Sequence, residues 1–125
     1  MTKDETNIKE KISIKEDKSK KVKVYGFLQK RSKYIHLWKT RFFILTNNYL
    51  FAFTGIENDA DCTMAMNLKG VLEVVEIPNE NKVKKEFEIK TINGNFFFRA
   101  ESEEVMKRWL NELNANLDKN KPNPE

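Results

Sequence analysis

Lysines and arginines gather in one acid-free stretch of this 125-residue chain. Between Lys18 and Ile56 there are nine of them and no aspartate or glutamate, although the whole chain is only +4. A surface of one sign attracts partners of the opposite sign. Within the stretch, Lys39 and Arg41 alternate with Thr40, and on a strand their side chains would share one face about 6.6 Å apart. Two cations at that spacing suit neighbouring phosphate oxygens.

The alternative for such a basic triplet is a solvated strand face, and the acid-free surroundings favour anion binding instead. Other chemistries find little support. One histidine, His36, and one cysteine, Cys62, cannot build a His/Cys metal cluster or an internal disulfide, and the lone cysteine fits a reducing compartment. Because no Ser/His/Asp set and no phosphate-cradling glycine loop is present, we expect no enzyme, no metal and no cofactor. His36 is expected to be a loop residue, with a phosphate contact as the weaker alternative.

The length of the chain allows one domain with one modest core. No apolar run approaches the ~20 residues of a membrane span, and no signal-peptide pattern is present. The sequence as given begins with Met1-Thr2, so the glycine that myristoylation requires is absent, although an anchor could lie upstream in a longer parent chain.

Short strands are expected to position the basic residues. Alternating apolar residues predict seven strands: near 22–28, 38–45, 49–53, 63–67 and 71–77, then around Phe87 and Ile89, and around Phe96 and Phe98. Gly26 within the first strand suggests a bulge or a close backbone approach. Thr46-Asn47-Asn48 predicts a tight hairpin turn, since asparagine tolerates positive φ, and Asn93-Gly94 is a strong hairpin signal.

One helix is expected after the strands. Ser102 is a good N-cap residue, and Val105, Trp109 and Leu113 then recur at helical spacing. This pattern predicts an amphipathic helix of about 15 residues, with Trp109 as a structural anchor in the core.

Both ends of the chain are polar. Residues 1–20 are expected to form a charged, flexible N-terminal arm whose only aliphatic residues are Ile8, Ile12 and Ile14. Residues 21–118 are expected to fold, and 119–125 to form a disordered tail.

Seven antiparallel strands followed by one C-terminal helix resemble a pleckstrin homology (PH) domain, a mainly β open barrel or orthogonal sandwich capped by its helix. Residues 25–30 (YGFLQK) match the opening G-x-L-x-K of that family, and residues 38–45 (WKTRFFIL) match its W-K-x-R-[WF]-F-x-L strand. Trp109 falls where the family places its nearly invariant tryptophan. The resemblance covers about residues 22–117. It implies a non-enzymatic module whose positive end binds anionic lipid headgroups.

The resemblance also implies which residues form the site. Carried over by position, Lys30, Lys39 and Arg41 would contact phosphate, and Arg31 and Lys33 would add positive charge. In the loop from Arg31 to Leu37, three apolar residues would form a membrane-inserting tip: Tyr34, Ile35 and Leu37. The alternative is that Ile35 or Leu37 folds back over the barrel mouth.

Three departures from the family pattern affect which lipid headgroup we expect the domain to bind. Ala52 stands where members that bind triply phosphorylated inositol usually carry a tyrosine, and the Asn93-Gly94 hairpin is too short to close over a headgroup. The loop after the third strand holds three acids that would repel phosphate: Glu57, Asp59 and Asp61. These departures favour phosphatidic acid or a low-phosphorylated phosphoinositide. The resemblance extends loosely to an acylated subgroup that senses phosphatidic acid.

We therefore expect a cytoplasmic monomer that attaches peripherally to the cytosolic leaflet through anionic phospholipids. Five cations at about 1 kcal/mol each give roughly sub-millimolar, reversible binding. A PH-fold protein-interaction module with weak membrane affinity is the alternative. Nucleic-acid binding is disfavoured, because Phe96 and Phe98 are needed for the core and the cations lie elsewhere in the chain.

Overall fold

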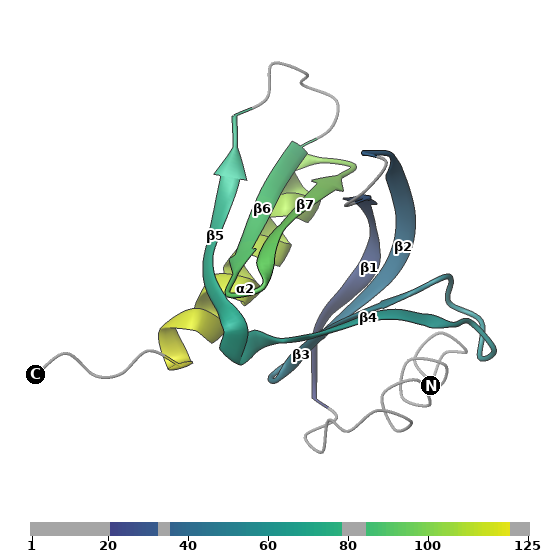
Figure 1. Ribbon diagram of the computed structural model, residues 1–125, viewed down its shortest axis with the longest axis horizontal. Helices are drawn as coiled ribbons and strands as arrows, with labels where there is room; N and C mark the ends of the chain where they lie inside the picture. The colour runs from purple at the N-terminus through teal and green to yellow at the C-terminus, as the bar shows by residue number, and fades with distance from the viewer. Residues whose placement is uncertain (1–20, 33–35, 79–84, 121–125) are drawn as a thin grey trace, which may run out of the picture.

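The computed structural model describes residues 21–32, 36–78 and 85–120. The predictions for the N-terminal arm, for residues 121–125 and for three loop residues (Lys33, Tyr34 and Ile35) lie outside these ranges. Seven strands form one antiparallel sheet in the order β4-β3-β2-β1-β7-β6-β5, followed by one helix (Figure 1). The elements are β1 Val22–Arg31, β2 Trp38–Thr46, β3 Tyr49–Phe53, β4 Cys62–Asn67, η1 Leu68–Gly70, β5 Val71–Ile77, β6 Lys85–Thr91, β7 Gly94–Ala100 and α2 Glu103–Asn120. The predicted strand count and the C-terminal helix are confirmed.

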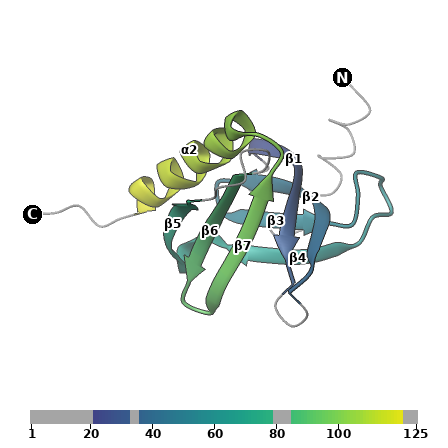
Figure 2. The same ribbon diagram turned by 90° about the horizontal axis from the view of Figure 1, so that it is seen from above.

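The sheet bends so strongly that β3 and β4 cross the direction of β5, β6 and β7 (Figure 1). Helix α2 lies against β5, β6 and β7 and also contacts β1 (Figure 2). The main core fills the space between the sheet and this helix. Trp109 is 1% exposed there, and its ring meets the ring of Phe43 edge to face with centroids 6.4 Å apart. The prediction that Trp109 anchors the core is therefore confirmed.

A second apolar cluster lies on the opposite side of the β2–β3 part of the sheet. Its buried members are Phe42, Ile44, Phe51 and Phe53. Alternation along β2 explains the division, because Phe43 and Leu45 belong to the main core and their neighbours Phe42 and Ile44 to the second cluster. We call the side of the sheet that faces the main core the inner face, and the other side the outer face.

Local sequence signals account for the start of α2 and for the β6–β7 hairpin. Ser102 caps α2, since its Oγ accepts a hydrogen bond from the Val105 N–H at 3.2 Å. The helix continues to Asn120, two residues into the segment expected to form the tail. At the Asn93-Gly94 hairpin, Gly94 has φ +128°, and the Thr91 hydroxyl accepts from the Asn93 N–H and donates to the Gly94 carbonyl.

Three local predictions differ from the structure. The turn at Asn47-Asn48 forms, but neither asparagine has a positive φ; among the described non-glycine residues, only His36 does. The turn is held instead by the buried Thr46 hydroxyl, which accepts hydrogen bonds from the N–H groups of Asn48 and Tyr49. The irregular register of β1 lies between Val22 and Val24 and not at Gly26. Arg31, expected to begin the loop, is the last residue of β1 and pairs with Trp38.

Candidate functional site at the barrel mouth

Three of the predicted cations share the inner face where β1 and β2 leave the core. Lys30 pairs with Lys39, and Leu28 pairs with Arg41, across these two strands. Leu28 belongs to the main core, and paired residues of antiparallel strands project to the same side. Lys30, Lys39 and Arg41 therefore extend the inner face beyond the end of the core. We call this end of the domain the barrel mouth.

Lys30 is the most enclosed of these three cations. It lies beside β7, where it pairs with Phe98, and its Nζ lies 5.2 Å from the centroid of the Phe96 ring. Burial lowers the pKa of the Lys30 ammonium below its ordinary value, and the nearby positive charge of Arg41 lowers it further. An anion at the mouth would offset both effects.

No carboxylate of the described residues forms a salt bridge with Lys30, Lys39 or Arg41. The Arg41 guanidinium donates one hydrogen bond, from Nη1 to the Thr40 carbonyl at 3.0 Å. Lysines and arginines elsewhere in the domain do pair with acids: Arg99 with Glu86, Lys90 with Glu73 and Lys107 with Glu103. The mouth thus concentrates cations whose charge the described part of the chain leaves uncompensated.

Arg31 lies on the other face. Its guanidinium carbon lies 5.1 Å from the centroid of the Phe97 ring, and its Nη2 donates to Nδ1 of His36 at 2.8 Å. The five cations grouped together by sequence are therefore not one cluster. Three share the inner face, Arg31 projects outward, and Lys33 lies outside the described residues.

The described ends of the loop between β1 and β2 are tied together at the base. The Ser32 N–H donates to the Leu37 carbonyl at 2.7 Å, and the His36 N–H donates to the Ser32 carbonyl at 3.2 Å. Leu37 is 57% exposed, so of the two alternatives for this residue it follows the projecting one and does not fold back over the mouth.

A pocket of about 130 Å³ lies between the end of β1 and the β6–β7 hairpin. Its lining residues are Lys30, Arg31, Ser32, His36, Asn93, Gly94, Asn95, Phe96 and Phe97. A larger pocket of about 490 Å³ lies between β4 and the same hairpin, but Lys69 is the only cation in its lining. The charge distribution therefore favours the smaller pocket and the adjoining inner face as the place for an anion.

The hairpin residues Asn93, Asn95 and Phe96 were not predicted to line the site. They reach it because β7 pairs with the end of β1, a contact between segments far apart in the chain. Arg99 of β7 was also not predicted: its guanidinium carbon lies 4.0 Å from the centroid of the Trp38 ring, and it forms a salt bridge with Glu86 at 2.6 Å. Only the strand order of the family could have indicated these contacts in advance.

Two of the three departures that bear on specificity are located in the same way. Ala52 is 1% exposed in the main core beside Phe43, so this position offers no polar group to a ligand. The acidic loop between β3 and β4 packs Ile56 and Ala60 against the second cluster, on the outer face. The loop is thus anchored on the side of the sheet away from Lys30, Lys39 and Arg41.

The PH domain family model matches residues 22–118, and this chain belongs to the PH domain family. Family membership confirms the predicted fold. Members of this family are generally non-catalytic modules that bind lipids or proteins, so the prediction that the domain is not an enzyme is also confirmed. Within the described residues, no helix has the length and hydrophobicity needed to cross a bilayer.

Individual relatives agree with this assignment. A PH domain-containing protein of Dictyostelium discoideum is 33% identical over 94 residues, which are 74% of this chain but only 20% of that protein. The PH domain of Slm1 in complex with inositol-4-phosphate is 26% identical, with a TM-score of 0.63 over 77% of this chain and 97% of that one. A Slm1 PH domain in complex with phosphoserine is 27% identical, with a TM-score of 0.59 over 72% of this chain and 90% of that one.

Proposed function

We propose that this domain binds anionic phospholipid headgroups at the barrel mouth and recruits its parent chain to the cytosolic face of a membrane. The observation that carries the proposal is the inner-face set of Lys30, Lys39 and Arg41, which has no carboxylate partner among the described residues. Lysine supplies a compact charge and arginine a planar fork, so together they suit the oxygens of one phosphate group.

A headgroup with an accessible phosphomonoester fits this site best. Inositol-4-phosphate and phosphoserine, found in the Slm1 structures, both carry a phosphomonoester. Three cations match one such group, whereas buried Ala52 supplies no hydroxyl for a larger, more phosphorylated ring. We therefore propose phosphatidic acid or a singly phosphorylated phosphoinositide as the ligand.

Attachment through this mouth alone would be brief. Each cation near an anionic surface contributes about 1 kcal/mol, so the three inner-face cations give on the order of 3 kcal/mol. Exposed Leu37 at the base of the loop would add apolar contact with the interface. Stable residence would still need a second attachment in the parent chain.

Vesicle flotation tests this proposal. Phosphatidylcholine vesicles containing phosphatidic acid, phosphatidylserine, phosphatidylinositol 4-phosphate or phosphatidylinositol 4,5-bisphosphate are compared with neutral vesicles. Binding to the first and third is expected to be strongest and to weaken as salt is raised. The double variant Lys39→Ala/Arg41→Ala should lose most of it. Lys107→Ala/Arg108→Ala, which removes the same charge from exposed positions on helix α2, is the matched control.

Unchanged flotation of Lys39→Ala/Arg41→Ala on every anionic vesicle would refute this site. If the unaltered chain binds no vesicle yet retains a protein partner, the domain is instead a protein-interaction module of the PH fold.

A further inference from the structure

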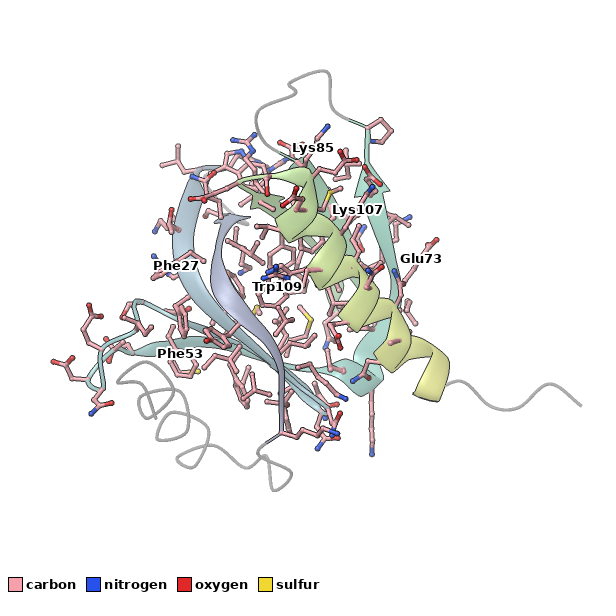
Figure 3. All side chains as sticks on the ribbon, turned by 180° about the vertical axis from the view of Figure 1, so that it is seen from behind. Phe27, Phe53, Glu73, Lys85, Lys107 and Trp109 are labelled. Atoms are coloured by element: carbon pink, nitrogen blue, oxygen red, sulfur yellow. The ribbon has the colours of Figure 1, made fainter. Side chains whose placement is uncertain are left out.

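The larger pocket, of about 490 Å³ between β4 and the β6–β7 hairpin, is not used by the headgroup site. Its volume lies within the range of about 300–1,000 Å³ that is usual for small-molecule pockets. Figure 3 shows Trp109 pointing into the space under α2, so this helix closes one end of the barrel. Figure 2 shows the turn of the β6–β7 hairpin at the end away from α2. The larger pocket therefore lies at the open end, beside the mouth.

The lining of this pocket is mainly apolar. Met66 belongs to the main core, and Met64 and Phe96 pack against that core, so the core forms the floor of the pocket. Ile92 forms the hairpin side and is 70% exposed. Its N–H donates to the Gly70 carbonyl at 3.0 Å, which ties this wall to η1. A tethered aliphatic wall facing adaptable methionine side chains suits a hydrocarbon chain.

The apolar pocket and the smaller cationic pocket have two lining residues in common, Asn93 and Phe96. The Phe96 ring joins the two, because the Nζ of Lys30 lies 5.2 Å from its centroid and the same ring lines the apolar side. A phosphate held by Lys30 would therefore lie close to an apolar wall. Together the two pockets match a molecule in which a hydrocarbon chain follows closely after a phosphate.

On the basis of the headgroup site proposed above, we propose that the domain binds a single-chain phosphate lipid of the lysophosphatidic acid class. Its phosphate would lie at Lys30, Lys39 and Arg41, and part of its acyl chain in the apolar pocket. A chain that stays in a bilayer is already in an apolar phase and gains little by entering the pocket. A single-chain lipid dispersed in water gains about four-fold in affinity for each methylene group that the pocket covers. The pocket therefore favours lipids that leave the membrane as monomers.

Soluble ligands test this proposal without vesicles. Isothermal titration calorimetry measures the affinity of the full chain for glycerol 3-phosphate and for butanoyl-, hexanoyl- and octanoyl-lysophosphatidic acid, each below its critical micelle concentration. Affinity should rise along this series, to about ten-fold or more for the octanoyl ligand over glycerol 3-phosphate. Octanoyl-lysophosphatidylcholine has the same chain but no phosphomonoester, and should bind far more weakly than octanoyl-lysophosphatidic acid. Because every ligand is monomeric, insertion of exposed side chains into a bilayer cannot contribute.

A change in the hairpin wall tests the place of the chain. Ile92→Ser alters an exposed position, so the free energy of unfolding should stay close to that of the unaltered protein. The affinity for octanoyl-lysophosphatidic acid should fall several-fold, and the affinity for glycerol 3-phosphate should not change. Leu72→Ser is the matched control, since Leu72 is 63% exposed and lies on β5 outside the pocket lining. It should leave both affinities unchanged.

Equal affinity for glycerol 3-phosphate and octanoyl-lysophosphatidic acid would overturn this proposal and leave the headgroup site intact. Equal losses in Ile92→Ser and Leu72→Ser would also overturn it, because the chain would then bind elsewhere. So would octanoyl-lysophosphatidylcholine binding as tightly as octanoyl-lysophosphatidic acid, because the phosphate would then play no part. If Lys39→Ala/Arg41→Ala leaves the affinity for every phosphate ligand unchanged, the headgroup site itself fails, and this proposal fails with it.

Discussion

Lys30 and Lys39 are direct partners across β1 and β2, so two ammonium groups project to the same side at the end of the core. Burial disfavours the charged form of Lys30, and the nearby positive charge of Arg41 disfavours it further. This arrangement costs folding free energy. This cost is explained if the cations bind an anionic ligand that is not part of the chain.

Replacing Lys30 should therefore separate stability from binding. Lys30→Met removes a partly buried charge, so the free energy of unfolding should stay equal or rise, while binding to phosphatidic acid vesicles should fall about five-fold, corresponding to about 1 kcal/mol. The measurements are urea unfolding and flotation. Arg108→Met, at an exposed position on helix α2, is the control and should leave binding unchanged. A less stable Lys30→Met protein that still binds would contradict this account.

The lowered pKa of Lys30 also fixes the direction of a pH effect. Because the folded state holds this proton less tightly than the unfolded state, the contribution of Lys30 to stability should rise as the pH increases from its folded pKa toward the ordinary value of 10.5. Lys30→Met should remove this part of the pH dependence of the free energy of unfolding, which urea unfolding at several alkaline pH values measures. An identical slope in both proteins would show that Lys30 does not contribute.

Arg31 and Arg41 should differ in their effect on binding, because they lie on opposite faces. Arg41→Ala should weaken flotation about five-fold, the loss expected for about 1 kcal/mol. Arg31→Ala should have a smaller effect, since its guanidinium already contacts Phe97 and His36. The reverse order would move the headgroup site to the outer face of β1.

Leu37 should contribute to membrane binding without contributing to stability. It is 57% exposed at the base of the loop, so Leu37→Ser should leave the unfolding midpoint unchanged and weaken flotation by on the order of 1 kcal/mol. Leu72→Ser is the matched control, because Leu72 is a similarly exposed leucine, at 63%, on the edge strand β5, three strands from β1 in the sheet. Equal losses in both variants would mean that the loop has no special role.

Ser102 offers a test of the helix cap. Ser102→Ala removes the oxygen that accepts from the Val105 N–H and should lower the free energy of unfolding by about 1 kcal/mol. Ser102→Asp keeps an acceptor at the N-cap and should remain close to the unaltered protein. Urea unfolding measures both. If alanine and aspartate have the same effect, the hydrogen bond contributes nothing to stability.

The fold could be predicted because its signals are local. The Asn93-Gly94 hairpin, the Ser102 cap and the spacing of Trp109 and Leu113 each depend on a few neighbouring residues. The turn at Asn47-Asn48 was located correctly but for the wrong reason, because the Thr46 hydroxyl replaces positive φ there.

The site could be predicted only in part. Alternation placed Lys39 and Arg41 on one face, and the family motif added Lys30. Two facts were not predicted. Arg31 extends β1 opposite Trp38, which turns it outward and shortens the expected loop. Phe96 of β7 lies under Lys30, and this contact depends on long-range pairing. The proximity of Lys30 to Phe96 follows from how β1 and β7 meet, which no local pattern encodes.

Strand β1 runs through the domain from Val22 at one end to Lys30 and Arg31 at the other. Nine steps of an extended strand span about 30 Å. If the mouth rests on a bilayer, the peptide bond leading into Val22 is held up to this distance above the headgroups. Strand β1 then acts as a rigid spacer between the lipid surface and whatever is joined on its N-terminal side. Partners attached there would work in the aqueous layer beside the membrane, at a height set by the length of one strand.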